Sequence, residues 1–440
     1  MDHRFKAYPA RCQSATHNSA NIPWETGVSI CLHGRVVELA GLQGTLADHW
    51  GTVDFRLSGA ELLLRVGDIV EMSGFSTADG LRVEKLVRLA IAKKKAWGET
   101  GDWQTYCRQR RMIRQNLLLK AAVLKAIRDF FCQGEFVEIE TPALVPAAGQ
   151  DMHIQLFKTT YSSRRDWPYF LITSPEHHMK RLLGDGWERI YQICRCFRNG
   201  ERSDRHNPEF TMVEWYRAYA SYEEIMEDVQ ALVGHVCQAV LGDRELVYNR
   251  LQIDLRPPWE RLTVREAFAR YAGLEDIQWR DKQDFEHRVR ELGCDSVAED
   301  DSWEDIFYKL LLEKVEPALA ERGPVFLVDY PANMAALAKL KEGDDSVAER
   351  VELYIGGLEL ANGFTELNDP AEQHQRFIDE RQRRLEAGYP AHPLDEEFLE
   401  MLERGMPPAG GMALGIDRLV MLLADAQELD HVVAFPFPKV

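Results

Sequence analysis

The chain has 440 residues, and its 71 acidic side chains outnumber 53 basic ones to give a net charge of −18. This length predicts two or three domains, while the acidic excess argues against a general role in coating nucleic acid. No apolar run approaches the length of a membrane span, and the polar start lacks a signal-peptide core. The eight cysteines show no zinc-type Cys-x-x-Cys spacing. We therefore expect buried structural thiols in a cytoplasmic protein.

The first quarter of the chain predicts a small all-β domain. Residues 1–26 carry few apolar residues and are expected to be a lead-in. Residues 27–90 alternate between apolar and polar side chains and are punctuated by glycines, which is typical of short strands. We expect these strands to close a barrel from four segments: Val28–Leu39, Thr52–Leu57, Ile69–Phe75 and Leu81–Leu89.

A larger domain of helices and strands is predicted to follow. Residues 91–115 are basic and polar, and predict a linker with a solvated face; contact with phosphate is the alternative. Helical spacing of apolar residues begins at Asn116 and starts the domain 116–440. Further helices are predicted at Tyr222–Val240, Val264–Ala272 and Asp305–Leu319, and a buried strand at Pro324–Tyr330. The whole pattern indicates an α+β fold.

The most informative segment runs from Arg198 to Glu214. It joins an apolar strand, Ile190–Phe197, to a second strand, Glu209–Tyr216, through a loop rich in charged and polar residues. Such a hairpin places Arg198 and His206 at its rim. A cluster of directional cations there predicts an anion site.

This hairpin resembles motif 2 of the class II aminoacyl-tRNA synthetases, in the lysyl branch. Phe130–Pro146 is similar to motif 1 of that family, and Gly410–Leu423 is similar to motif 3. The resemblance implies an antiparallel sheet surrounded by helices, preceded by a barrel of the oligonucleotide-binding type. In the barrel, Leu46 and Leu81 occupy the places of an aromatic and a polar base reader. A docking module and a nucleic-acid platform both remain open for it.

The family resemblance also implies a set of ATP-binding residues. Arg198 is expected to hold the α-phosphate through its planar guanidinium, with Arg418 as the second ATP arginine and His206 near the phosphates. Glu352 and Glu359 are expected to bind Mg²⁺ from an antiparallel pair of strands, and Asn362-Gly363 is compatible with the hairpin turn. The remaining predicted ATP contacts are Asn199, Gly200, Glu201, Asn207, Phe210, Leu353 and Gly415.

Selection of a lysine-like substrate requires the neutralisation of two ammonium groups, for which we expect buried carboxylates without basic partners. Glu214, Tyr216 and Glu366 match the pocket for the side-chain ammonium of lysine, and Glu176 matches the acid that holds the other amine. A diamino acid substrate follows. The other predicted substrate contacts are Ser174, Pro175, Glu359, Asn362 and Ala413.

Several positions resemble a paralogous family, the ligases that attach (R)-β-lysine to elongation factor P. Ala361 and Ala413, which we expect to face the same pocket, stand where the tRNA enzymes have glycine. Ser174 replaces alanine, and Asp151–His153 replaces a Gly-rich stretch. The resemblance implies activation of β-lysine or lysine by ATP, transfer to a lysine of elongation factor P, and a homodimer. A lysyl-tRNA synthetase acting on tRNA and a non-catalytic amino-acid sensor are the alternatives. Two departures are the barrel itself and Gly200, where the family has glutamate.

Overall fold

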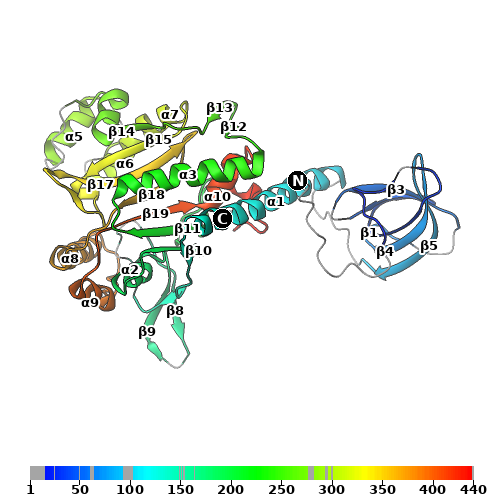
Figure 1. Ribbon diagram of the computed structural model, residues 1–440, viewed down its shortest axis with the longest axis horizontal. Helices are drawn as coiled ribbons and strands as arrows, with labels where there is room; N and C mark the ends of the chain where they lie inside the picture. Colours follow the sequence, from blue (N-terminus) through cyan, green and yellow to red (C-terminus); the bar gives the residue numbers. More distant parts are fainter. Residues whose placement is uncertain are drawn as a thin grey trace. The chain divides into compact units, whose positions relative to one another are not determined.

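The computed structural model describes residues 15–438, apart from 24, 49, 60–63, 93–102, 148, 150, 152–153, 163, 276–281, 293–295 and 299–300. The chain divides into two compact units, residues 1–112 and residues 113–440 (Figure 1). A barrel forms most of the first unit, and a large mixed sheet with helices forms the second. The predicted α+β fold is confirmed.

Five strands among the described residues close the barrel in the order β1-β2-β3-β5-β4. This order is consistent with an oligonucleotide-binding type of fold. Its core is apolar, and Leu46 and Leu81 belong to it, each 2% exposed. The prediction that these two leucines occupy the positions of base-contacting residues is therefore wrong, because their side chains fill the interior of the barrel. The strands are β1 Ser29–Ala40, β2 Gln43–Ala47, β3 Thr52–Leu57, β4 Ile69–Thr77 and β5 Gly80–Ala90.

Helix α1, Trp103–Gln133, begins well before the predicted helix start at Asn116. The second half of the predicted linker 91–115 is thus helical. Its Arg, Gln and Met residues are good helix formers, and no glycine or proline interrupts them, so a high charge did not prevent the helix. Residues 93–102 lie outside the described part of the chain.

In the described part of the second unit, nine strands form one mixed sheet. Its path is β14-β15-β17-β18-β19-β11-β10-β6, with β16 paired to β17. The two end pairs on this path, β14 with β15 and β10 with β6, are parallel, and the pairs between them are antiparallel. The strands are β6 Val137–Glu138, β10 Arg189–Phe197, β11 Glu209–Ala218, β14 Glu260–Thr263, β15 Val325–Pro331, β16 Leu340–Lys341, β17 Asp344–Ile355, β18 Leu358–Thr365 and β19 Ala409–Gly415.

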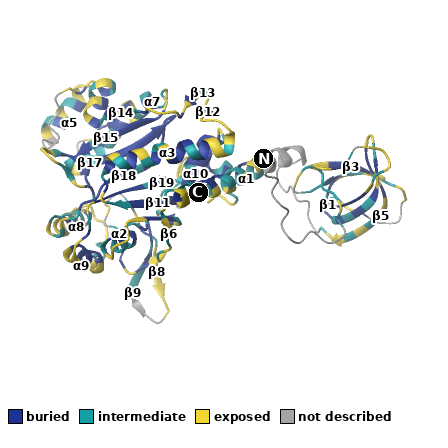
Figure 2. Cartoon of the chain, viewed as in Figure 1, coloured by how far each residue is buried: buried dark blue, intermediate teal, exposed yellow. Residues whose placement is uncertain are grey.

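Strand alternation gives the two faces of this sheet different roles. On β11, Val213 and Trp215 enter the main core together with α1, α3 (Tyr222–Leu241) and α10 (Ile416–Leu423). Tyr216 points to the other face, where it packs with α2 (Glu176–Gly184), α8 (Pro370–Glu386) and α9 (Glu396–Arg404). Figure 1 shows α8, α9 and α2 gathered together, apart from α3. The central strands are buried along most of their length (Figure 2).

A third group of helices packs on the β14–β15 end of the sheet and forms its own apolar cluster. It contains α4 Val264–Ala267, a π-helix Phe268–Ala272, α5 Lys282–Glu291, α6 Trp303–Leu310, a π-helix Leu311–Val315 and α7 Glu316–Leu319. Short elements complete the unit: β7 Leu144–Val145, β8 Lys158–Tyr161, β9 Arg164–Leu171, β12 Glu245–Tyr248, β13 Leu251–Asp254, and 3₁₀ turns at Ala332–Met334 and Leu429–His431.

The hairpin of β17 and β18 turns at Gly356 and Gly357, with φ values of +58° and +77°. Two consecutive left-handed residues suit a tight hairpin turn, and glycine adopts them without steric cost. Asn362 and Gly363 instead lie inside β18, opposite Glu352 and Val351. The suggested turn at Asn362-Gly363 is therefore wrong.

The described cysteine side chains are free thiols: Cys31, Cys132, Cys194, Cys196 and Cys237. Cys196 is buried and Cys194 half-buried, but Cys132 is exposed, so burial does not hold for all of them. Cys12, Cys294 and the side chain of Cys107 lie outside the described residues.

Among the described residues, none of the helices combines the length and the apolar character that a membrane span requires.

Candidate active site

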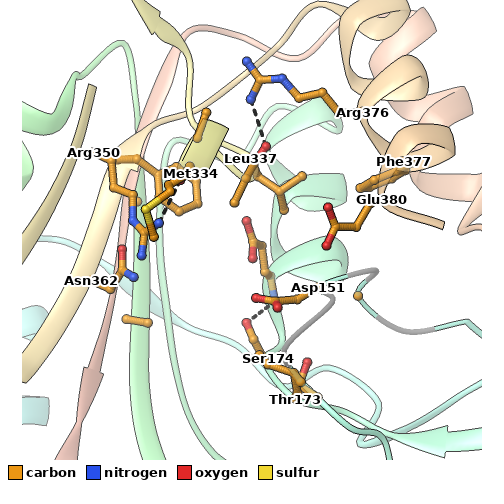
Figure 3. Close-up of a pocket in the computed structure, with 18 of the residues that line it drawn as sticks. Asp151, Thr173, Ser174, Met334, Leu337, Arg350, Asn362, Arg376, Phe377 and Glu380 are labelled. Atoms are coloured by element: carbon orange, nitrogen blue, oxygen red, sulfur yellow. Dashed lines mark hydrogen bonds between the residues drawn. The ribbon is translucent and has the colours of Figure 1, made fainter. Parts of the chain in front are cut away.

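A cavity of about 720 Å³ opens in the second unit, on the face of the sheet that carries Glu214 and Tyr216. Figure 3 shows Arg350 and Asn362 on one side of it, facing Phe377 and Glu380 of α8 on the other. The sequence predicted several of the residues that line it: Ser174, Glu176, Arg198, Glu214, Tyr216, Asn362, Glu366 and Ala413. Pro175 is buried at the N-cap of α2, between the lining residues Ser174 and Glu176.

Glu214 is the central acid of the cavity floor. It accepts hydrogen bonds from the hydroxyls of Tyr216, over 2.5 Å, and Ser174, over 2.8 Å. Ser174 also accepts from the backbone N–H of Glu176, which fixes its hydroxyl at the start of α2. Burial, with the nearby charge of Glu176, raises the pKa of Glu214 to about 7. A cation placed beside this carboxyl would stabilise its ionised form.

The other two predicted acids, Glu176 and Glu366, both contact the ammonium group of Lys180. Lys180 is 1% exposed, and its Nζ donates to Glu176 Oε1 over 2.6 Å and forms an ion pair with Glu366. Its pKa is raised, because the two acids outweigh the desolvation that opposes it. The expectation that these carboxylates lack a basic partner is therefore wrong for Glu176 and Glu366. The i, i+4 spacing of Glu176 and Lys180 on a helix was the available sequence signal.

The raised pKa of Glu214 leads to a pH prediction. In the free protein its carboxyl is about half protonated near pH 7, whereas a bound ammonium favours the carboxylate, so binding releases a proton. Affinity for the diamino acid is expected to rise by up to about tenfold per pH unit as pH approaches 7 from below, and then to level off. Calorimetric titration in buffers of different ionisation enthalpy measures both the affinity and the proton release.

The matched variant for this titration is Glu214→Gln, which keeps the shape of the side chain and removes the carboxyl group that titrates. It is expected to bind the diamino acid weakly and with little dependence on pH over the same range. A Gln variant that retains the full pH slope would show that another group takes part.

A second cluster, around Arg418 and His206, lies where the loop between β10 and β11 meets the start of β18 and the start of α10. Arg418 donates to His206 Nε2 over 2.7 Å, to the backbone oxygen of Glu359 over 2.7 Å, and to its carboxylate over 3.2 Å. Burial and the charge of Arg418 lower the pKa of His206 to about 4. His206 is thus a neutral acceptor that holds Arg418, with its other nitrogen paired to Ser203 Oγ at 2.9 Å.

Arg198 connects this cluster to the cavity. Its guanidinium carbon lies 5.2 Å from the centre of the Phe210 ring, and its side chain also lines the cavity. Within the described residues, the buried Nε of Arg198 and Oδ1 of Asn207 have no hydrogen-bond partner. Buried polar atoms ordinarily find a partner, so these two favour a bound polar ligand at this place.

Gly200 in motif 2 and Gly415 in motif 3 differ in what their surroundings require. Gly200 has φ +84°, a left-handed conformation that a glutamate would adopt only with strain, which explains why glycine stands there. Gly415 has an ordinary φ of −73°, and an added Cβ would meet no atom closer than 3.9 Å. Neither the backbone nor the packing around it requires glycine at position 415, and its predicted contact with ATP stays a prediction. Asn199 is exposed and Glu201 half-buried on the same loop.

The predicted metal acids are already engaged with the protein. Glu352 is buried and accepts from Arg350 over 2.7 Å, Tyr330 over 2.6 Å and Tyr354 over 2.8 Å. Burial and the charge of Glu359 raise its pKa. Mg²⁺ commonly takes one or two carboxylates together with substrate phosphates. The donor set fits such a shared ion, with Glu359 as the more available ligand.

A third acid at this place was missed from the sequence. Burial and the charges of Glu359 and Glu352 raise the pKa of Glu316, at the start of α7, to about 7. Glu316 is far from both in sequence, and only the fold brings it near. A divalent cation between these acids would relieve their repulsion.

Two predicted residues do not face the site. The side chain of Leu353 is fully buried in the main core, so the predicted contact with ATP, which stays a prediction, would be made by its backbone. Ala361 belongs to the same core and does not line the cavity, whereas its neighbour Asn362 does. Successive strand residues point to opposite faces. The interpretation that Ala361 and Ala413 face one pocket is therefore wrong, and only Ala413 lies there.

Residues 104–439 match the family of class II tRNA synthetases (D, K and N). The chain belongs to this family. Its relatives are ligases of two kinds. It is 37% identical to the lysine–tRNA ligase of Carboxydothermus hydrogenoformans over 86% of this chain and 79% of that one. It is 38% identical to the elongation factor P–(R)-β-lysine ligase of Vibrio atlanticus over 74% of this chain and 96% of that one. The corresponding ligase of Hamiltonella defensa is 39% identical over 74% and 95%.

As a member of this family, the protein is a lysyl-tRNA synthetase-like ligase. Enzymes of the family generally use ATP and Mg²⁺. Identity is nearly equal for the two kinds of relative, so it does not separate them.

Proposed function

We propose that this enzyme activates (R)-β-lysine with ATP and transfers it to a lysine side chain of elongation factor P. In the first step an oxygen of the amino-acid carboxylate attacks the α-phosphorus, and the bond to pyrophosphate breaks. In the second step a neutral ε-amine attacks the carbonyl carbon, the bond to AMP breaks, and the amine loses its proton.

The chain's own residues supply binding and orientation for these steps. Glu214, with Tyr216 and Ser174, receives an ammonium group, and Lys180 keeps Glu176 and Glu366 in place beside it. Arg198 and Arg418 are positioned for the phosphates, where fixed cations stabilise the charge that develops in the transition state. Mg²⁺, held by Glu359 and Glu352, would neutralise phosphate charge.

The observation that carries the choice of substrate is the position of Ala413. On β19 it stands opposite Glu214 of β11 on one side and Asn362 of β18 on the other. Its methyl group therefore lies on the floor between the acid that receives an amine and a polar neighbour. A difference of one methyl group in such a floor changes selection by about 1–3 kcal/mol.

Replacing this methyl group tests the proposal. Ala413→Gly is expected to shift the preference from β-lysine toward α-lysine by roughly 5- to 100-fold in ATP–pyrophosphate exchange. Ala409→Gly, on the same strand but outside the cavity lining, is the control for the effect of glycine on the strand. An unchanged ratio in Ala413→Gly would contradict the role given to this residue.

Transfer assays with two acceptors test the second half of the proposal. The purified enzyme is incubated with ATP, Mg²⁺ and β-lysine, and with elongation factor P or lysine tRNA in parallel. A gain in mass of elongation factor P by one β-lysyl group is expected. No gain, together with charging of the tRNA, would overturn the acceptor but not the activation step.

A lysine–tRNA ligase is the second candidate. It is favoured by the barrel, whose strand order is consistent with an oligonucleotide-binding fold, and by the longer match to the tRNA ligases. A non-catalytic sensor is the third, and exchange dependent on a diamino acid would exclude it. We also propose a homodimer through the motif 1 region, which light scattering of the purified protein measures.

A further inference from the structure

The outer face of the barrel carries a group of side chains that the proposed reaction does not use. On β1, Ile30 and Leu32 point into the barrel core. Because successive strand residues point to opposite faces, Cys31 and His33 point outward. Glu71 of β4 stands directly opposite His33 in the strand pairing. The pleat and the register together place a thiol, an imidazole and a carboxylate on one patch.

These groups are close together and sheltered. One ligand atom from each of Cys31, His33 and Glu71 lies within 4.8 Å of the other two. The closest pair is His33 Nε2 and Glu71 Oε2, at 2.9 Å. Cys31 is 9% exposed, and the side chains of His33 and Glu71 are 22% and 17% exposed. Partial burial lowers competition from water without closing the site.

We propose that Cys31, His33 and Glu71 form a binding site for a transition-metal ion of the Zn²⁺ class. Sulfur, imidazole nitrogen and carboxylate oxygen are the donors that Zn²⁺ takes in proteins, and a site with three protein ligands leaves a fourth position for water. In tetrahedral geometry such donors are separated by about 3.3–3.6 Å. Since the donor atoms all lie within 4.8 Å of one another, displacements of roughly 1 Å would bring them to these separations.

The ion would join parts of the barrel that are distant along the chain. His33 and Glu71 are 38 positions apart, so a shared ion closes a long loop and disfavours the unfolded state. Cys31 also holds the incoming segment, since its backbone oxygen accepts from the N–H groups of Thr16 and His17. The ion would therefore stabilise the barrel and the segment that is hydrogen-bonded to Cys31.

Cobalt is the probe for this site, because thiolate bound to Co²⁺ gives a near-ultraviolet charge-transfer band that oxygen ligands do not. The full chain is treated with chelator and titrated with CoCl₂. One equivalent is expected to produce the band, and ZnCl₂ is expected to displace it. Co²⁺ bound at Glu352 and Glu359 contributes no sulfur band, so the two sites are distinguished.

Matched cysteine variants decide which thiol is bound. Cys31→Ser is expected to abolish the band, whereas Cys132→Ser, at an exposed thiol of the other unit, is expected to keep it. No band in the parent protein, or an equal band in Cys31→Ser, would overturn the proposal. Because Cys31→Ser can disturb folding, Glu71→Gln gives an independent measurement: it is expected to weaken Zn²⁺ binding about tenfold or more while the band persists. Unchanged Zn²⁺ affinity in Glu71→Gln would show that the Glu71 carboxylate is not a ligand of the ion.

Discussion

Arg198→Lys is expected to lower kcat/KM for ATP–pyrophosphate exchange by about 10²- to 10³-fold, the usual effect of losing one aligned donor to a developing charge. A guanidinium offers two parallel donors in a plane, and an ammonium offers a point charge that cannot reproduce them. Arg198 also stacks near Phe210, so lysine would lose this support as well. Exchange kinetics at saturating amino acid, with ATP varied, measure the effect.

Arg195→Lys is the matched control for this prediction. Arg195 lies on the same strand, β10, is exposed, and faces Glu209 at 3.5 Å rather than the cavity. The same substitution there is expected to leave exchange almost unchanged. Equal losses in the two variants would mean that the strand, rather than the guanidinium of Arg198, is responsible.

Lys180→Met is expected to destabilise the second unit by about 3–5 kcal/mol, because it leaves buried acids without their shared cation. Glu366 is 1% exposed, and Lys180 provides its ion pair. Loss of diamino-acid binding is expected as well, because the acids then take up protons and lose their charge. Urea unfolding followed by circular dichroism measures the stability, and calorimetry measures the binding.

Two comparisons separate this effect from simple loss of a lysine. Lys125→Met removes an exposed i, i+4 pair with Asp129 and is expected to change stability little. The double variant Lys180→Met with Glu366→Gln is expected to recover part of the lost stability, because the unpaired charge is gone. A Lys180→Met variant as stable as the parent would contradict the assigned role.

Local sequence was sufficient for the elements of the site. The hairpin from Arg198 to Glu214 was predicted with its strands nearly at their observed ends, since strand alternation and loop composition are short-range signals. Strand β2, Gln43–Ala47, was missed, because five residues with a glycine and a glutamine carry little pattern. The same weakness concealed the early start of α1, where charge in residues 103–115 was interpreted as a linker.

The sequence by itself predicted the family, the α+β fold and the candidate acids and arginines apart from Glu316, because motif spacing and strand alternation are short-range features of the sequence. Only the tertiary structure decided how those groups are paired. Lys180 meets Glu366, and Arg418 meets His206, across separations that no periodicity predicts. It also decided that Ala413 faces the cavity while Ala361 and Leu46 are buried in cores. The physical reason is that strand register and burial depend on long-range pairing, which one strand alone does not encode.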